Sequence, residues 1–191
     1  SLASESRFER RRVARLARSI PLEVAELMSI TLLRREALRR SLEQDQVQAY
    51  WIASFQNVEY LTGFGGGDSH LVLTKDRCVL VSDGRYTTEI GEIVEDEVEP
   101  WIRPVGQEMA LGIVDVLRAL GVSRVGFEGH HLGYSQVVLL ETEWDPGEAH
   151  PIPPRVERLR MRKDAQELAI LREAVALAEG AFLEVRARLT C

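Results

Sequence analysis

The chain has 191 residues, of which 45% are hydrophobic and 28% are charged, and its net charge is −6. This composition is enough for a folded core, and the absence of any run of about 18 apolar residues excludes a membrane-spanning helix. The first residues lack the apolar core of a secretory signal, so we expect a cytoplasmic protein. The acidic balance, and the lack of aromatic residues among the N-terminal arginines, argue against nucleic-acid binding.

Residues 1–44 are predicted to be a helical N-terminal extension. The arginine-rich stretch 5–19 has the composition of a charged helix. Pro21 disfavours helix at the residue before it, so the first helix is expected to end there. A second helix is expected over 22–32 and a third over 33–44.

Residues 45–155 are predicted to form an α/β domain. The expected strands are 47–53, 71–74, 78–82, 98–102 and 124–128, and the expected helices are 56–62, 83–93, 107–120 and 134–143. Only three residues separate the second and third strands, which is typical of a hairpin. Pro100 favours an outer position for its strand, because proline has no N–H to donate to a ladder. Alternating helices and strands with one hairpin predict three layers around a mixed sheet.

A glycine-rich loop follows the first short helix of this domain. Gly63 and the run 65–67 allow a sharp bend or a close approach of the backbone, and the polar residues Asp68 and His70 come next. The loop lacks the Gly-Lys-Ser/Thr ending of a P-loop and leads into a strand, so phosphate binding is not expected. Asn57 is expected to cap its own turn of helix.

Residues 156–191 are predicted to be a linker and the first helix of a missing second domain. Asp164 and Glu167 have the spacing of a capping box. Beyond them, apolar residues repeat at steps of three and four: Leu168, Leu171, Val175, Ala178, Phe182, Val185 and Leu189. Such an apolar stripe must be buried against another apolar surface. We therefore expect this chain to self-associate, or to pack the helix onto its own core or its N-terminal helices.

Four segments resemble, in the same order, the N-terminal domain of the creatinase, prolidase and aminopeptidase P family. They are NVEYLTGF at 57–64, SDGRYT at 82–87, VGFE at 125–128 and LRMRKDAQEL at 159–168. The resemblance spans about residues 33–190, and the first 30 residues do not match it. It implies a ribonuclease-H-like α/β fold for 45–155 and the start of a truncated "pita-bread" catalytic domain after it.

The resemblance also implies a function. We expect this chain to be the non-catalytic N-terminal domain of a metal-dependent Xaa-Pro aminopeptidase or prolidase. In such an enzyme the domain would serve oligomerisation and substrate gating. In such enzymes two divalent metals, commonly manganese, activate a water, and two Asp, one His and two Glu of the catalytic domain hold them. None of those positions lies in this chain, so we expect here no catalytic residue, no metal ligand and no cofactor. The expected partners are further copies of the chain and, for the full-length parent, a proline-containing peptide.

By the same resemblance, the loop at 65–70 is the substrate-facing element. Asp68 and His70 are the candidates to read the amino end of a peptide or to restrict its length, and Arg85 is a third candidate contact. The alternatives are structural: the glycines only join helix to strand, and Arg85 pairs with Asp83 or another carboxylate.

Two further functions fit the same fold. One is a protein-binding module of a peptidase-like pseudo-enzyme, with the arginine-rich N-terminus as a docking segment. The other is a creatinase-like amidinohydrolase domain, in which a small guanidino compound replaces the peptide. The acidic segment 92–99 is expected to be a solvated sheet edge and not a metal site, because no His accompanies it.

Overall fold

The computed structural model describes residues 22–93 and 97–189. The chain divides into two compact units, Ser1–Val156 and Glu157–Cys191. Its elements in chain order are α2 (Leu22–Asp45), β1 (Ala49–Ile52), α3 (Phe55–Thr62), β2 (His70–Thr74), β3 (Cys78–Asp83), the 3₁₀ turn η1 (Gly84–Tyr86), α4 (Thr87–Ile93), β4 (Glu99–Arg103), α5 (Met109–Ala119), β5 (Arg124–Phe127), α6 (Tyr134–Glu143), β6 (Glu148–Pro151), α7 (Arg155–Met161) and α8 (Ala165–Leu189). No helix in the described ranges combines the length and the apolar character needed to cross a bilayer.

Six strands form one mixed sheet in the order β4-β3-β2-β1-β5-β6. β2 pairs antiparallel with both β1 and β3, whereas β4 pairs parallel with β3, β5 with β1, and β6 with β5. The predicted α/β class, the hairpin and the outer position of the strand with Pro100 are confirmed. The strand β6 was not predicted, because a proline-rich sequence favours a linker. Its Pro151 is the last residue of an edge strand, where a missing donor costs little.

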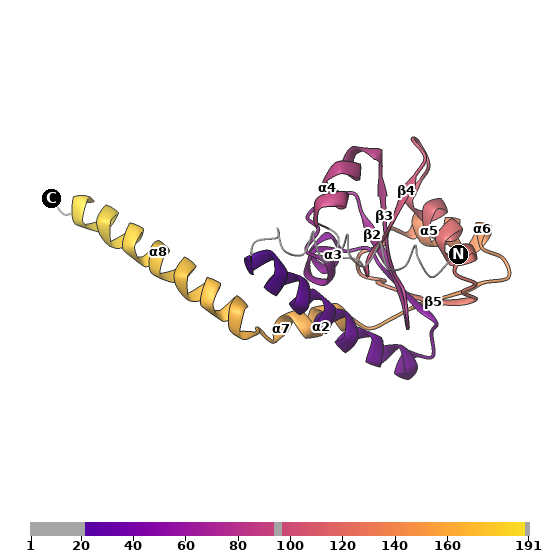
Figure 1. Ribbon diagram of the computed structural model, residues 1–191, viewed down its shortest axis with the longest axis horizontal. Helices are drawn as coiled ribbons and strands as arrows, with labels where there is room; N and C mark the ends of the chain where they lie inside the picture. Colours follow the sequence, from indigo (N-terminus) through magenta and orange to yellow (C-terminus); the bar gives the residue numbers. More distant parts are fainter. Residues whose placement is uncertain (1–21, 94–96, 190–191) are drawn as a thin grey trace, which may run out of the picture. The chain divides into compact units, whose positions relative to one another are not determined.

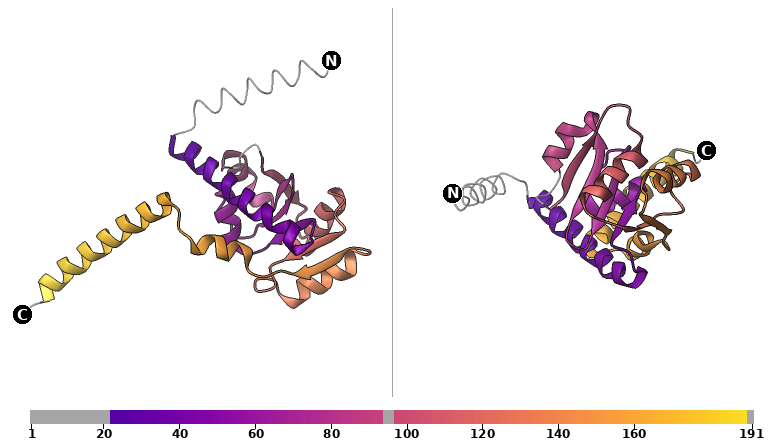
Figure 2. Two further views of the ribbon diagram at one scale, coloured as in Figure 1. Left: turned by 90° about the horizontal axis from the view of Figure 1, so that it is seen from below. Right: turned by 90° about the vertical axis from the view of Figure 1, so that its right-hand side faces the viewer.

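Helices cover both faces of the sheet, with α5 and α6 on one side and α2 and α3 on the other (Figure 1). On the first side, buried residues of four strands pack against α5 and α6 in one core, which includes Trp51, Val72, Val81, Ile113 and Leu117. Seen from below, α2 runs across the other side (Figure 2, left). Both faces of β1 are therefore buried, which explains why its sequence is uniformly apolar instead of alternating.

The two helices predicted between residues 22 and 44 are one continuous helix, α2, because no proline or glycine interrupts this stretch. Two of its arginines hold α3. The side chain of Arg35 is fully buried, and its Nη1 donates to the carbonyl of Leu61 at 2.9 Å. Arg34 covers the ring of Tyr60 at 3.9 Å and donates to the carbonyl of the same residue. The helix predicted over 5–19 lies outside the described residues.

In the second unit, the predicted capping box is confirmed. The N–H of Asp164 donates to Glu167 Oε2 at 3.0 Å, and the N–H of Glu167 donates to Asp164 Oδ1 at 2.9 Å. None of the described side chains of α8 is buried, and that of Phe182 is 66% exposed. The predicted apolar stripe thus exists, and within the second unit it has no cover. The helix α7, which precedes it, was not predicted.

Candidate functional site

Two glycines of the loop have a structural role. Gly63 ends α3 in the left-handed conformation, with φ 75°, and its N–H donates to the carbonyl of Glu59. A Cβ on Gly66 would lie 2.3 Å from the ring of Phe64, a fully buried side chain that meets Tyr86 edge-on. The glycines at 65 and 67 have neither a positive φ nor a close neighbour that a Cβ would displace. The bend and the close approach therefore depend on Gly63 and Gly66.

A buried carboxylate holds the start of α3. Glu128 follows β5, and its Oε2 accepts hydrogen bonds from the backbone N–H groups of Ala53 and Ser54, both at 2.8 Å. Its Oε1 accepts from Asn57 Nδ2 at 2.6 Å. The predicted capping role of Asn57 is wrong, because Ser54 occupies the N-cap and Asn57 lies inside the helix. Asn57 and Glu128 instead join two of the four signature segments, a pairing that sequence spacing could not reveal.

Asp68 and Arg85, two of the predicted site residues, meet where β3 and β4 end. The parallel register places Asp83 beside Arg103. Asp68 Oδ2 accepts from Nη2 of both Arg85 and Arg103, each at 2.9 Å. Asp83 Oδ2 accepts from Arg85 Nη2 at 2.6 Å and lies 3.5 Å from Arg103 Nη2. We call these four residues the Asp–Arg cluster.

The Asp–Arg cluster has an inner and an outer pair. The side chains of Arg103 and Asp83 are 10% and 15% exposed, whereas those of Arg85 and Asp68 are 65% and 51% exposed. The side-chain and backbone hydrogen bonds from Arg85 lower the pKa of Asp83 to about 2. Both bonds to Asp68 use Oδ2, so Oδ1 faces no donor among the described residues. The cluster therefore offers solvent one fixed carboxylate oxygen and an exposed guanidinium.

The predicted pairing of Arg85 with Asp83 is confirmed, and Arg85 contacts Asp68 as well. Arg103 was missed. Its contribution follows from the register of β3 and β4, which are separated by α4 in the sequence. Its Nη1 also donates to the carbonyl of Gln107, which fixes the guanidinium against the loop before α5.

His70, the third predicted residue, bonds to Trp51 and not to Asp68. Trp51 lies opposite Val72 in the β1–β2 ladder, so His70 is its diagonal neighbour on the same face of the sheet. Trp51 Nε1 donates to His70 Nδ1 at 2.9 Å. Burial lowers the pKa of His70 to about 4, with the negative charge of Asp68 opposing this shift and the positive charge of Arg103 adding to it. His70 is therefore neutral near pH 7.

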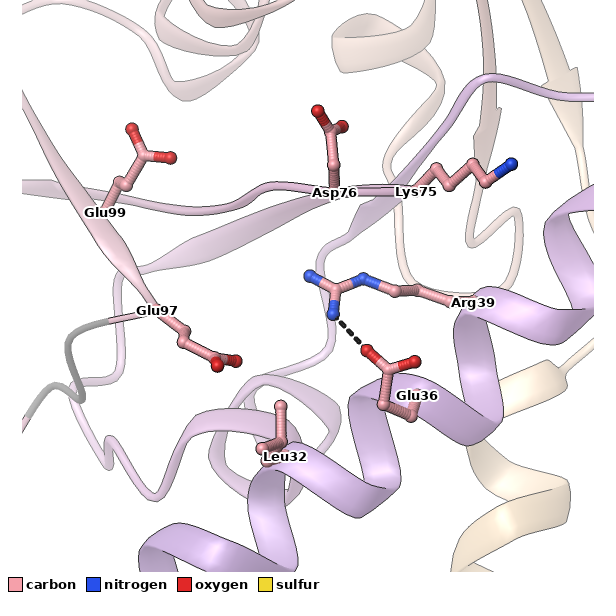
Figure 3. A pocket seen from close by; sticks show the side chains of 7 residues that line it. All are labelled: Leu32, Glu36, Arg39, Lys75, Asp76, Glu97 and Glu99. Atoms are coloured by element: carbon pink, nitrogen blue, oxygen red, sulfur yellow. Dashed lines mark hydrogen bonds and ion pairs between the residues drawn. The ribbon is translucent and has the colours of Figure 1, made fainter.

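An open pocket of about 630 Å³ lies at the other ends of β3 and β4, bounded by α2. Figure 3 shows Asp76, Glu97 and Glu99 around it, with Glu36 bonded to Arg39. Glu99 and Glu97 each have an arginine partner. Arg77 Nε donates to Glu99 Oε1 at 2.8 Å, and Arg35 Nη2 lies 3.8 Å from Glu97 Oε2. Among residues 22–93 and 97–189, no group of three His, Cys, Asp or Glu side chains could hold a metal ion. The described acidic residues Glu97 and Glu99 thus pair with arginines at this edge of the sheet.

Known peptidases resemble this chain in sequence and in fold. An uncharacterized peptidase of Bacillus subtilis (strain 168), YqhT, is 29% identical over 156 residues, which are 78% of this chain and 42% of that protein. The Xaa-Pro dipeptidase from Bacillus anthracis superposes with a TM-score of 0.76 at 23% identity, over 83% of this chain and 44% of that chain. This chain thus spans less than half the length of these two proteins.

A solved domain also matches nearly throughout its own length. The N-terminal domain of the cytoplasmic peptidase PepQ from Mycobacterium tuberculosis H37Rv superposes with a TM-score of 0.60 at 27% identity, over 66% of this chain and 98% of that one. The family model for the Creatinase/Prolidase N-terminal domain matches residues 34–162, which include the whole sheet, α3 and the Asp–Arg cluster. The chain therefore belongs to the creatinase/prolidase N-terminal domain family.

Proposed function

We propose that this chain is the non-catalytic N-terminal domain of a metal-dependent Xaa-Pro aminopeptidase or prolidase, in which it supports oligomerisation and gates the substrate. The family match and the likeness to a Xaa-Pro dipeptidase support the peptidase assignment. The observation that supports gating is the Asp–Arg cluster beside the glycine loop, with its outer pair open to solvent. A cytoplasmic location is part of the proposal, by analogy with the peptidase PepQ.

Residues 156–191 are proposed to lead into the catalytic domain, with α8 as its first helix. The exposed stripe on α8 supports this, because a helix with so much apolar surface needs a cover. The two divalent metals, proposed to be manganese, belong to that catalytic domain. Among the described residues, no group of three His, Cys, Asp or Glu side chains has the arrangement of such a metal site.

The outer pair of the Asp–Arg cluster suits one end of a short peptide. Arg85 and Arg103 donate to Asp68 only at Oδ2 and fix its orientation, so Oδ1 remains available to accept from a peptide ammonium group. In the proposed oligomer, this loop faces the active site of a neighbouring subunit. A fixed carboxylate at that place would select peptides with a free amino end and exclude peptides whose chain continues beyond that end.

The test is steady-state hydrolysis of an Xaa-Pro dipeptide by the manganese-loaded parent enzyme. Asp68→Asn keeps the shape of the side chain and removes its charge, and we expect a rise in KM of about tenfold, since a hydrogen bond to a charged group contributes about 1.5 kcal/mol. The matched control is Asp76→Asn, in the turn between β2 and β3 at the other end of the sheet, which should leave KM unchanged.

Four results would overturn parts of this proposal. Equal KM values for Asp68→Asn and the wild type would remove the gating role. Hydrolysis by the 191-residue chain alone would show that it is catalytic. A parent enzyme that binds no metal and hydrolyses no Xaa-Pro peptide would favour the pseudo-enzyme alternative. Analytical ultracentrifugation of the parent tests oligomerisation, and a monomer would contradict it.

A further inference from the structure

The bond between Trp51 and His70 determines which nitrogen of the imidazole carries hydrogen. An indole N–H can only donate, so His70 Nδ1 must accept through its lone pair. A neutral ring that accepts at Nδ1 carries its hydrogen on Nε2. Among the described residues, Nε2 has no hydrogen-bond partner, and the ring is partly exposed. The ring therefore presents a free N–H next to the Asp–Arg cluster.

The surroundings of His70 oppose its protonation. A proton on Nδ1 would set two N–H groups against each other at the Trp51 contact, and burial already disfavours the charged ring. Two charged groups act on it: Asp68, whose charge favours protonation, and Arg103, whose charge opposes it. Asp68 accepts hydrogen bonds from Arg85 and Arg103 and makes none to the imidazole.

We propose that Trp51 is a positioning residue that fixes His70 as a neutral Nε2–H donor, and that this donor takes an uncharged acceptor, a carbonyl oxygen of the bound peptide. The inference rests on the proposed function and deepens it. Asp68 reads the positive charge at the amino end of the substrate, and His70 reads the backbone of the same peptide. Because His70 stays neutral across neutral pH, its Nε2–H remains a donor throughout that range.

The tautomer is tested on the full 191-residue chain with ¹⁵N-labelled histidine. The signal of His70 is assigned by its loss in His70→Gln, since the chain has four histidines. We expect a pyridine-type Nδ1 and a pyrrole-type Nε2, unchanged between pH 5.5 and 8. In Trp51→Phe the Nδ1 partner is gone, so the two tautomers should mix and the titration should move up toward the ordinary range of histidine.

A second buried tryptophan provides the matched control. Trp144 belongs to the same core as Trp51 but does not bond to His70. Trp144→Phe should therefore leave the His70 nitrogen shifts unchanged while removing a comparable indole. An Nδ1–H tautomer in the wild type, a wild-type titration between pH 6 and 7, or identical shifts in Trp51→Phe and the wild type would each overturn the inference.

The peptide contact is tested in the parent enzyme. His70→Leu removes the donor and should lower kcat/KM about fivefold, the value of one neutral hydrogen bond, and His70→Gln, which keeps an N–H, should lie between His70→Leu and the wild type. Equal values for His70→Leu and the wild type would overturn the carbonyl contact. The outcomes are separable from the proposed function: a changed KM in Asp68→Asn with the wrong His70 tautomer refutes only this inference.

Discussion

Replacing Glu128 with alanine is expected to lower the free energy of unfolding of the first unit by about 4 kcal/mol. The change removes the acceptor of two backbone N–H groups and of the Asn57 amide, at a place where Ser54 and Asn57 are buried. A buried donor left without an acceptor costs about 1–3 kcal/mol. Ala53 is only half-buried and can be hydrated, so the sum falls well below three full penalties. Glu128→Gln keeps one acceptor oxygen and should cost about 2 kcal/mol.

The assay is urea unfolding followed by tryptophan fluorescence, because Trp51, Trp101 and Trp144 all lie in the first unit. Glu148→Ala is the control, since this carboxylate is 62% exposed and its partner Arg124 is 3.7 Å away. An exposed ion pair of this kind contributes less than about 1 kcal/mol. The midpoint should fall in the order wild type, Gln, Ala at constant m. A loss under about 1 kcal/mol for Glu128→Ala would refute the reasoning that this carboxylate holds α3.

Two further predictions concern the glycine loop and the ion pair between Asp45 and Arg155. Gly66→Ala should lower the free energy of unfolding by about 2 kcal/mol, because the new Cβ meets the buried ring of Phe64. Gly67 has open space and no positive φ, so Gly67→Ala should change the free energy of unfolding by less than about 1 kcal/mol. Equal effects of the two substitutions in urea unfolding would contradict this. Burial tends to raise the pKa of Asp45, but hydrogen bonds and charge from Arg155 lower it overall. The stability that this pair contributes should thus be full above the unfolded-state pKa of about 3.9 and should fade as pH falls through the lower pKa of the folded state. The free energy of unfolding of Arg155→Met should therefore approach that of the wild type at acid pH. A difference in free energy that persists at acid pH would contradict this linkage.

Local sequence patterns were sufficient for most elements of the sheet. The strands β2 and β3 and the helix α6 follow from runs of apolar residues bounded by turn residues, and the capping box located the start of α8. The strand β6 escaped because none of its four residues is β-branched or a large apolar residue, and only its partner β5 makes it a strand. The break predicted inside α2 failed because no residue in that stretch interrupts a helix.

The candidate site was accessible to sequence reasoning only in part. Asp68 and Arg85 lie in or beside signature segments, so the resemblance indicated them. Arg103 and Trp51 join the site through strand register, which depends on how the whole sheet assembles. Likewise, Asn57 looked like a cap because helix caps are local, and its partner Glu128 comes 71 residues later. Long-range pairing is the information that single-sequence patterns lack.

The strand order has a consequence for biosynthesis. β1 is the first of the described strands to leave the ribosome, yet its neighbour β5 begins at Arg124, after β2, β3 and β4 have been made. Until then, the nascent sheet would present Ala49–Ile52 as an open edge, and an uncovered apolar edge is a template for pairing with other chains. The strand at the centre of the finished protein is therefore the one most dependent on protection during translation.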